Sequence, residues 1–423
     1  MIKANDPELQ SWIPVGRDSD FPLQNIPFGI VVPPDGGPRA ATRIGDTVID
    51  LYSLAVNGLL DGPGLDPDLF KREFLNPLIA TGKHSWRALR DRLSDLFSSG
   101  NPVLRDDTVL QASALMPVSS VKMLLPVAVG DYTDFYSSIE HATNVGRMFR
   151  DPAHALLPNW RHLPVGYHGR SSSIVVSGTG IHRPKGQIKA EGGDWPVFGP
   201  TRRLDFELEV AFITGRGTEL GSSIPVTEAE DYIFGLVLFN DLSARDIQTW
   251  EYVPLGPFLS KNFGSVISPW IVTLDALEPF RVAGPTQEPE VLPYLKVQGN
   301  RNFNISLEVF IQAERADAYR ICHSNFHYMY WNMAQQLAHQ TVNGCNIRVG
   351  DIYASGTISG PEPGSYGSML ELAWKGTKPV SLPDGSTRTF LEDGDTVIMR
   401  GFADNGRYRI GFGEAVTRIL PAI

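Results

Sequence analysis

The sequence predicts a mostly-β protein of the α+β class that is divided into two domains. Three observations lead to this prediction. The chain has 423 residues, which is more than one hydrophobic core usually organises. It contains 41 Gly and 32 Pro without a regular period, a density of turn-forming residues that is typical of loop-rich β architectures. Short apolar or alternating runs lie between these turns, and helical periodicity is rare.

The N-terminal domain is predicted over residues 1–120. Three short β-type runs, the pattern of a small open barrel or sheet, occupy Gly29–Val32, Ala41–Ile44 and Thr47–Leu51. Between Asp68 and Ser99, apolar residues recur at three- and four-residue steps, which predicts two short helices. A stretch rich in Pro, Val and Ser follows from Ala114 to Val127, and we therefore place the domain boundary near residue 120.

The larger domain, residues 121–423, is predicted to consist mainly of strands. Segments with strand character between Gly and Pro turns are Ser173–Val176, Leu204–Ile213, Phe234–Asn240, Ile267–Leu274, Asn304–Ile311, Met369–Trp374, Thr396–Arg400 and Tyr408–Gly413. One long helix is predicted between Ser324, as its N-cap, and Gly344, as its stop signal. Apolar residues recur on one face of this segment between Phe326 and Leu337.

Composition argues against several classes of function. The chain has 37 Lys and Arg against 47 Asp and Glu, a net charge of -10, which is the wrong sign for a protein that neutralises nucleic-acid phosphates. The two cysteines, Cys322 and Cys345, are too few for a disulfide framework and favour a reducing cytoplasm. The N-terminal segment has no apolar leader, and no stretch approaches the roughly 18 apolar residues of a membrane span. We expect a cytoplasmic protein without nucleic-acid or membrane partners.

Acidic residues alternate along the predicted strand Leu204–Ile213. Asp205, Glu207 and Glu209 share one face of this strand, and neighbouring carboxylates are roughly 6.5 to 7 Å apart along the backbone. On an exposed face they would simply be the solvated side of an edge strand. Opposite a second acidic group they would form part of a cation site.

Two further acidic residues lie where such a group is expected. Asp241 follows the apolar strand Phe234–Asn240, and there it either caps a helix that starts near Ser243 or faces a site. Asp134 lies among aromatic residues shortly after the domain boundary, as a site wall or as a turn residue. Together, four residues would supply an all-oxygen environment: Asp134, Glu207, Glu209 and Asp241. Ca²⁺ and Mg²⁺ prefer such ligands, whereas zinc and copper favour imidazole or thiolate.

Basic groups and one histidine follow these carboxylates along the chain. His141 is a natural general base if a carboxylate orients its second nitrogen, and otherwise it is a satisfied core histidine. Arg245 and Gln248 are three residues apart on one predicted helical face, and both can donate hydrogen bonds to an oxyanion. Lys261 follows in a glycine-containing loop. The plain alternatives are a surface ion pair of Arg245 with Asp246 or Glu251, and a solvated loop charge for Lys261.

Other chemistries lack their motifs. His323 and His327 have i, i+4 spacing, but the H-E-x-x-H zinc motif is not present, so we interpret them as surface or core residues. Neither a P-loop nor a G-x-G-x-x-G fingerprint after a strand occurs. Gly356–Gly360 places its serine one position too late for a serine-hydrolase elbow.

Five long motifs resemble the fumarylacetoacetase family: Gly130–Ser138, His141–Gly146, Asn240–Gln248, Trp250–Phe258 and Ala354–Glu362. The resemblance extends from the N-terminal domain to the C-terminus. It implies an N-terminal SH3-like barrel domain and a C-terminal mixed β-sandwich roll that forms a homodimer. It also implies a hydrolase acting on carbon–carbon bonds in ketonic substances, which converts 4-fumarylacetoacetate to fumarate and acetoacetate in the last step of tyrosine and phenylalanine catabolism.

The resemblance also implies a role for individual residues. A divalent cation, Mg²⁺ or Ca²⁺, would be bound by Asp134, Glu207, Glu209 and Asp241, with Lys261 and Ser265 nearby. The catalytic residues would be His141, its carboxylate partner Glu371, and the oxyanion donors Arg245, Gln248 and Lys261. Contacts with the substrate would come from Tyr136, Arg150, Arg245, Gln248, Tyr252, Lys261 and Thr357. Two departures from the family pattern are Ser260 and Ser265, where glycine and threonine are expected.

Two other functions are weighed against this one. Acylpyruvate hydrolases and related β-diketone hydrolases, decarboxylases and isomerases of the same superfamily keep the acidic cluster, but the length and the large N-terminal domain speak against them. A non-catalytic Ca²⁺-binding module would need the carboxylates and would have no use for His141, Glu371, Arg245 and Lys261 together. The sequence therefore favours an enzyme with a small-molecule substrate.

Overall fold

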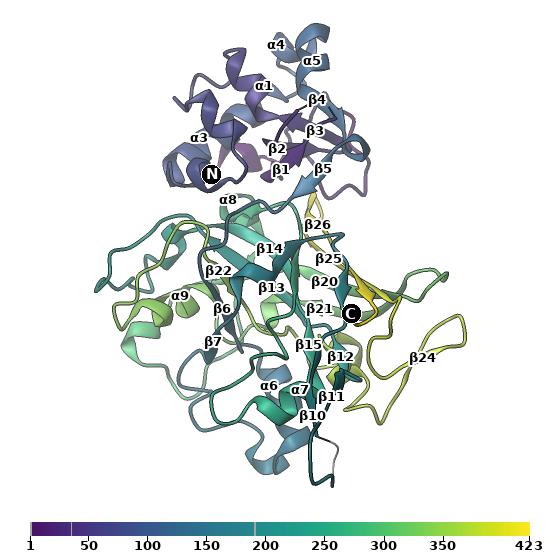
Figure 1. Cartoon of the computed structure of the whole chain (residues 1–423). Helices are drawn as coiled ribbons and strands as arrows, with labels where there is room; N and C mark the ends of the chain where they lie inside the picture. Colours follow the sequence, from purple (N-terminus) through teal and green to yellow (C-terminus); the bar gives the residue numbers. More distant parts are fainter. Residues whose placement is uncertain (1, 35, 190–191) are drawn as a thin grey trace.

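The computed structural model describes residues 2–34, 36–189 and 192–423 and confirms the mostly-β, α+β class. Figure 1 shows a smaller N-terminal part, purple to blue, against one end of a larger part that contains the long sheets. Among the helices of these described residues, none combines the length and apolar character that crossing a bilayer requires.

The N-terminal part contains a five-stranded antiparallel sheet with the order β4-β3-β2-β1-β5. Its strands are β1 (Gly29–Val32), β2 (Arg39–Ile44), β3 (Thr47–Asp50), β4 (Leu115–Pro117) and β5 (Lys122–Leu124). The three predicted strands are therefore present. The third is shorter than expected because Asp50 accepts hydrogen bonds from the amides of Tyr52 and Ser53, which begins a helix at Leu51.

Helices surround this sheet. They are α1 (Leu51–Val56), α2 (Asn76–Ile79), α3 (Lys83–Leu96), α4 (Pro102–Arg105) and α5 (Thr108–Ala114), with 3-10 turns at η1 (Lys3–Asn5), η2 (Pro67–Lys71) and η3 (Val118–Ser120). The predicted helical stretch between Asp68 and Ser99 contains α2 and α3. Strand β5 lies beyond residue 120 and still pairs with β1, and the domain boundary near residue 120 stays a prediction.

The two parts share apolar and ionic contacts. Trp86 of α3 packs edge-on against Phe234 of the large sheet, with 5.0 Å between ring centroids. Arg87, on the same helix, donates two hydrogen bonds of 2.7 Å to the carboxylate of Asp275. These contacts bury one face of the large sheet under the N-terminal helices, while its other face remains available to the second sheet.

Two sheets form the larger part. The first has the order β7-β6-β22-β13-β14-β16-β8, with β17 also paired to β14. Its strands are β6 (Tyr132–Phe135), β7 (Gly166–His168), β8 (Ile174–Val176), β13 (Leu208–Thr214), β14 (Ile233–Asp241), β16 (Ser265–Ile267), β17 (Val272–Thr273) and β22 (Ile352–Ala354). The second has the order β21-β20-β25-β26-β9. Its strands are β9 (Ile181–His182), β20 (Ser306–Gln312), β21 (Tyr319–Asn325), β25 (Thr396–Asp404) and β26 (Arg409–Leu420).

Four short two-stranded sheets complete the strands: β10 (Lys185–Ile188) with β11 (Val197–Pro200), β12 (Leu204–Asp205) with β15 (Ser243–Ala244), β18 (Arg281–Val282) with β19 (Asn302–Phe303), and β23 (Val380–Ser381) with β24 (Thr387–Arg388). The helices of this part are α6 (Ile139–Phe149), α7 (Arg245–Glu251), α8 (Leu274–Leu277), α9 (Met333–Thr341) and α10 (Met369–Leu372). The 3-10 turns are η4 (Pro152–His154), η5 (Ser171–Ser173), η6 (Ala229–Tyr232), η7 (Glu278–Phe280), η8 (Pro293–Leu295), η9 (Phe326–Tyr328) and η10 (Pro363–Ser365).

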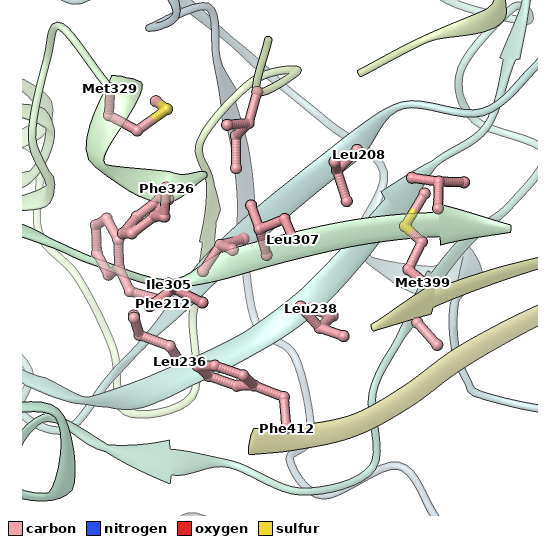
Figure 2. Close-up of a cluster of buried hydrophobic side chains, with 14 of the residues drawn as sticks. Leu208, Phe212, Leu236, Leu238, Ile305, Leu307, Phe326, Met329, Met399 and Phe412 are labelled. Atoms are coloured by element: carbon pink, nitrogen blue, oxygen red, sulfur yellow. The ribbon is translucent and has the colours of Figure 1, made fainter. Parts of the chain in front are cut away.

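A hydrophobic core fills the space between the two sheets (Figure 2). Leu208 and Leu238 enter it from β13 and β14, and Leu307, Met399 and Phe412 meet them from the second sheet. All five side chains are fully buried. Burial of side chains of this size stabilises a fold by about 1.5–3 kcal/mol each, so this core holds the sheet edge that carries the candidate site.

Four predicted elements differ in the structure. The long helix does not begin at Ser324, because β21 extends to Asn325 in register with β20. Helix α9 begins at Met333, where Asn332 and Gln335 form a capping box. His323 therefore lies on strand β21 and His327 on the 3-10 turn η9, so the two histidines do not share a face of one helix.

The segment Met369–Trp374 was expected to be a strand and is helix α10 followed by a turn. Its apolar run matches a buried strand, but Ser368 caps the first turn by accepting a hydrogen bond from the amide of Glu371. The predicted strand Leu204–Ile213 is broken between Asp205 and Leu208, and Ile267–Leu274 is broken between β16 and β17. Helix α6 was not expected.

Candidate active site

Four carboxylates converge at one edge of the large sheet. Asp134, Glu207, Glu209 and Asp241 are all buried, and each offers a carboxylate oxygen such that these atoms lie within 4.8 Å of one another. Asp134 and Glu209 come from β6 and β13, the two strands that flank β22, and Asp241 ends the neighbouring strand β14. Glu207 lies in the break between β12 and β13, where it bridges to Ser368. The structure therefore brings the four predicted ligands together.

The backbone is shaped to hold this cluster. Gly356 has a φ of +78°, and a Cβ at this position would meet the carbonyl oxygen of Phe135 at 2.3 Å. Its amide donates a 3.0 Å hydrogen bond to Oε2 of Glu209. A glycine is needed here because only the absence of a side chain lets the loop after β22 reach both β6 and Glu209.

Charge is unevenly balanced inside the cluster. Burial, followed by the nearby carboxylates, raises the pKa of Asp134 and of Glu209 well above the usual range. Burial also raises the pKa of Asp241. Glu207 behaves in the opposite way: burial opposes its ionisation, but Arg245 and Lys261 outweigh burial and lower its pKa. The four carboxylates therefore outnumber the two cationic side chains beside them, Arg245 and Lys261.

The residues present fit a hard divalent cation. Oδ1 of Asp134 and Oε1 of Glu209 are buried and have no hydrogen-bond partner among the described residues. Unpaired carboxylate oxygens in a buried position are costly unless a cation accompanies them. The donor set consists only of oxygens, the ligands of Ca²⁺ and Mg²⁺.

Lys261 and Ser265 border the same carboxylates. The Lys261 ammonium donates to Oε2 of Glu207 at 2.8 Å and also to Asp241. The Ser265 hydroxyl donates to Oδ1 of Asp241 at 3.0 Å. Lys261 is buried, so it is not a solvated loop charge, and the carboxylates raise its pKa even though burial opposes this. Asp241 does not cap α7, whose N-cap is Ala244.

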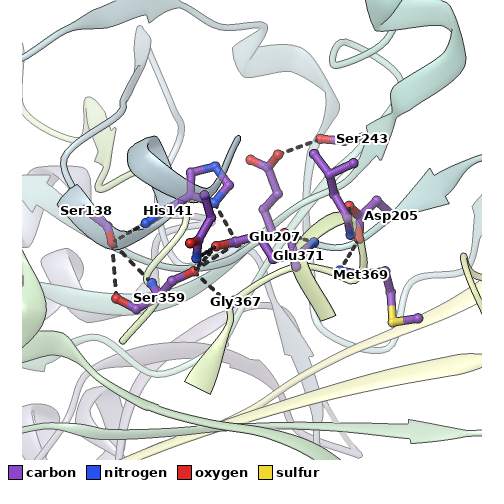
Figure 3. A network of polar contacts seen from close by, with 12 residues as sticks. Ser138, His141, Asp205, Glu207, Ser243, Ser359, Gly367, Met369 and Glu371 are labelled. Atoms are coloured by element: carbon purple, nitrogen blue, oxygen red, sulfur yellow. Dashed lines mark hydrogen bonds and ion pairs between the residues drawn. The ribbon is translucent and has the colours of Figure 1, made fainter. Parts of the chain in front are cut away.

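A histidine–carboxylate pair lies beside this cluster (Figure 3). Nδ1 of His141 is 2.6 Å from Oε2 of Glu371, and both side chains are buried. Helix α6 carries His141, and its N-cap Ser138 accepts a hydrogen bond from the His141 amide. The imidazole is near enough to Glu207 to help lower the pKa of that carboxyl. The predicted pairing of His141 with Glu371 is therefore present in the structure.

Glu371 is held by several hydrogen-bond donors. Asn144 donates to Oε1 at 2.9 Å, Ser368 donates to Oε2 at 2.9 Å, and the Ser359 hydroxyl lies within 3.0 Å of both oxygens. Burial opposes ionisation of Glu371, but His141 and these donors outweigh it and lower the pKa of the carboxyl. Glu371 therefore stays ionised and accepts a hydrogen bond from Nδ1, so Nε2 of His141 is the nitrogen that can take up a proton.

Arg245 and Gln248 lie on helix α7 beside the carboxylates. Arg245 donates from Nε to Asp205 at 2.9 Å and forms an ion pair with Glu207 through Nη1. It also donates to Oε1 of Gln248 at 3.3 Å. Arg245 therefore pairs with buried carboxylates and not, as in the plain alternative, with Asp246 or Glu251 on the surface. Asp246 instead accepts a hydrogen bond of 2.8 Å from the amide of Arg202.

The remaining predicted contacts are more dispersed. The Tyr136 ring lies edge-on to His141, with 5.2 Å between centroids, and the buried Thr357 hydroxyl has no partner among the described residues. Arg150 ends α6 on the surface and donates to the carbonyl of Ala155. Tyr252 is exposed directly after α7. The structure therefore places Tyr136 at the site and gives Arg150 and Tyr252 no contact with the acidic cluster.

Several site residues were not predicted from the sequence. Tyr167, on β7, directs its hydroxyl toward Asp241 at 3.4 Å, and burial raises the pKa of this phenol well above its usual value. Asn144 and Ser359 hold Glu371, and nothing in their sequence context indicates this. Asp205 did have a signal, as the third acid of the alternating strand, and the structure gives it contacts of its own with Arg245.

The fold and the site together define a mostly-β roll with a buried carboxylate cluster that could hold a metal ion, beside a histidine–carboxylate pair. Residues 24–126 match the family model described as Fumarylacetoacetase N-terminal, and residues 132–420 match Fumarylacetoacetate (FAA) hydrolase C-terminal. The chain belongs to the fumarylacetoacetate hydrolase family.

Relatives cover almost the whole chain. It is 53% identical to the fumarylacetoacetase of Homo sapiens over 417 residues, which is 98% of this chain and 99% of the relative. The fumarylacetoacetase of Arabidopsis thaliana gives the same identity and the same coverage. A solved fumarylacetoacetate hydrolase from psychrophilic Exiguobacterium antarcticum is 16% identical, with a TM-score of 0.54 over 94% of this chain and 99% of that chain, and it is similar in fold alone.

Proposed function

We propose that this chain is a fumarylacetoacetase. It hydrolyses the carbon–carbon bond of 4-fumarylacetoacetate to fumarate and acetoacetate, the last step of tyrosine and phenylalanine catabolism. About half of its residues are identical to those of fumarylacetoacetases along nearly the whole chain, which supports a hydrolase acting on carbon–carbon bonds. The observation that carries the proposal is the position of the His141–Glu371 pair beside the four buried carboxylates.

His141 is the general base of this reaction. Its Nε2 removes a proton from water, and the water oxygen attacks the carbonyl on the fumaryl side of the diketone. The tetrahedral adduct collapses to fumaric acid, which ionises to fumarate, as the carbon–carbon bond to the acetoacetyl part breaks. The departing enolate carbon takes up the proton from the imidazolium of His141 and becomes acetoacetate. Glu371 holds the imidazole by its hydrogen bond at Nδ1 and balances the charge of the imidazolium that forms. Four hydrogen-bond donors keep the Glu371 carboxylate in place during this transfer.

Developing negative charge is stabilised by Arg245, Gln248 and Lys261. Arg245 and Lys261 are buried beside the carboxylates, so their charge acts with little screening by water. Each donor to such an oxyanion is worth about 3 kcal/mol of transition-state stabilisation. When bound by Asp134, Glu207, Glu209 and Asp241, a divalent cation supplies Lewis-acid stabilisation for the enolate that leaves as acetoacetate.

The substrate carries two carboxylates and several oxygens that the protein has to orient. We assign Tyr136 and Thr357 to this task near the base, because Tyr136 contacts the His141 ring and the Thr357 hydroxyl is buried without a partner among the described residues. Arg150 and Tyr252 are assigned to the outer part of the substrate. Both residues are exposed in the structure.

We propose Mg²⁺ or Ca²⁺ as the cation and a homodimer as the active assembly, located in the cytoplasm. Two free cysteines without a disulfide are compatible with a reducing compartment. Large apolar side chains that remain exposed on the β11 hairpin and on the loop after α7 support a self-association surface: Trp195, Val197, Phe198, Val253, Leu255 and Phe258. Trp250 joins the two segments by donating a hydrogen bond to Gln187. Sedimentation of the purified chain as a monomer would contradict the dimer.

The function is tested by following the loss of diketone absorbance when the purified chain and Mg²⁺ are mixed with 4-fumarylacetoacetate. We expect the absorbance to fall with formation of equimolar fumarate and acetoacetate. Acylpyruvates serve as rival substrates in a parallel assay. A kcat/KM that is higher for an acylpyruvate than for fumarylacetoacetate would contradict the proposal and favour an acylpyruvate hydrolase.

A further inference from the structure

Asp205 is a fully buried carboxylate that lies next to the acidic cluster in sequence and is not one of its four members. Its Oδ1 accepts a 2.7 Å hydrogen bond from the amide of Met369, and its Oδ2 accepts a 3.0 Å hydrogen bond from the amide of Leu370. Oδ2 also accepts a 2.9 Å hydrogen bond from Nε of Arg245. The Asp205 side chain thus forms hydrogen bonds with two segments of the chain that are more than 100 residues apart. Figure 3 shows the contact with Met369.

The first of these segments is helix α10, which carries Glu371. A helix of only four residues has little stability of its own, because the cost of its first turn is not repaid by further hydrogen bonds. Its first amides need partners from outside the helix. Asp205 supplies them for Met369 and Leu370, and Ser368 supplies one for Glu371. The position of Glu371 therefore depends on the position of Asp205.

The second segment begins with Arg245 at the start of α7. Arg245 pairs with both Asp205, the last residue of β12, and Glu207, which lies in the break that follows β12. The pairing of β12 with β15 places Asp205 opposite Ser243, just ahead of this helix. Asp205 therefore connects α10, which carries Glu371, to α7, which carries Arg245.

We infer that Asp205 is a positioning residue that sets the His141–Glu371 pair at its working distance from Arg245 and the carboxylate cluster. This inference rests on the proposed function. Asp205 acts through Glu371 and Arg245, and the four carboxylates that converge on one point do not include it. A displacement of about 1 Å in a catalytic group costs on the order of a hundredfold in rate, so release of α10 affects turnover strongly.

The test uses Asp205→Asn in the full chain, because asparagine keeps the size and loses the charge and one acceptor. We expect kcat to fall by about 30- to 100-fold, with KM for fumarylacetoacetate and the Mg²⁺ affinity from calorimetry each within about threefold of wild type. Asp205→Ser, which leaves no amide group facing the backbone amides, is measured in parallel in case asparagine prevents folding.

Asp395→Asn is the matched control. Asp395 is also buried, pairs with Arg388 at 2.8 Å and accepts a 2.8 Å hydrogen bond from the amide of Glu392, but it has no contact with the site residues. Removal of a carboxylate that has only a structural role lowers the melting temperature of the protein without changing kcat per folded molecule. We expect this behaviour for Asp395→Asn only.

A double-mutant cycle with Glu371→Gln distinguishes positioning from an independent effect. In the Glu371→Gln background, Asp205→Asn should reduce kcat by less than about threefold, because the group that it positions no longer works. Three outcomes would each overturn the inference. The first is a folded Asp205 variant with the kcat of wild type, and the second is full additivity in the cycle. The third is that both Asp205 variants fail to fold while Asp395→Asn folds. An inactive wild type would instead contradict the proposed function.

Discussion

Nδ1 of His141 lies 2.6 Å from Oε2 of Glu371, although the two residues are 230 positions apart in the chain. Helix α6 delivers the imidazole and helix α10 delivers the carboxylate, and each helix begins at a serine N-cap. The same carboxylate accepts hydrogen bonds from Asn144, Ser359 and Ser368. The pair therefore has one preferred tautomer and one orientation, which are the two properties that a general base needs before substrate arrives.

The first prediction concerns this base. His141→Ala should lower kcat by about 10²- to 10⁴-fold because the proton of the attacking water then has no acceptor in place. Calorimetry should show unchanged Mg²⁺ binding, since His141 is not among the four clustered carboxylates. His323→Ala, at an exposed strand position, serves as the control and should keep full activity. Near-normal turnover of His141→Ala would contradict the assignment of His141 as the general base.

The second prediction concerns the cation. Glu209→Gln should weaken Mg²⁺ binding at least about tenfold, as measured by calorimetry, because a charged oxygen ligand is lost. Without metal, the same variant should melt at a higher temperature than wild type, because burial and neighbouring carboxylates disfavour the charge of Glu209. With saturating Mg²⁺ the order should reverse. A variant that binds Mg²⁺ as tightly as wild type would show that the cation site is misplaced.

The third prediction concerns Ser260, which directly precedes Lys261 and is buried. Its hydroxyl donates a 2.7 Å hydrogen bond to Glu251, which also accepts hydrogen bonds from the amides of Phe258, Leu259 and Ser260. Ser260→Gly should lower the free energy of unfolding by about 1 kcal/mol and raise KM a few-fold, because this loop leads directly into Lys261. Urea unfolding and steady-state kinetics measure the two effects.

The matching control for Ser260 is Ser386→Gly, which removes a similar hydroxyl–carboxylate contact in an exposed turn. It should leave KM unchanged. An equal effect of the two variants on KM would show that the Glu251–Ser260 contact has no bearing on the site.

The fourth prediction concerns pH and a carboxyl outside the acidic cluster. Burial raises the pKa of Asp351 to about 6, outweighing the hydrogen bonds from the amides of Arg348 and Asp131. The folded state therefore binds more protons than the unfolded state between about pH 4 and pH 6, and stability falls as pH rises through this window. Above it the contribution is constant.

Urea unfolding of wild type and Asp351→Asn across this pH range measures the contribution. The difference between their free energies of unfolding should change by up to about 3 kcal/mol across the window, with wild type losing stability relative to the variant as pH rises. A difference that stays constant with pH would show that Asp351 titrates as it does in the unfolded chain.

Local patterns in the sequence were sufficient for much of the fold and indicated three of the four carboxylates that the structure brings together. Glu207 and Glu209 are marked by the alternation of their strand, and Asp241 by its place at the end of an apolar run. These signals survive because strand alternation and strand ends are set by neighbouring residues. The segment after Ser368 shows the limit: its apolar run reads as a buried strand, and capping makes it helix α10.

The chemical groups of the site and most of the strands that carry them are therefore predictable from local patterns in the sequence. The contacts of Asp205, the third acid of the alternating segment Leu204–Ile213, became known only from the fold. Asp205 bonds to the first turn of α10 and to Arg245, while Glu207 and Glu209 join Asp134 and Asp241. The physical reason is that hydrogen-bond partners and electric fields depend on distance in space, and these partners are distant in sequence.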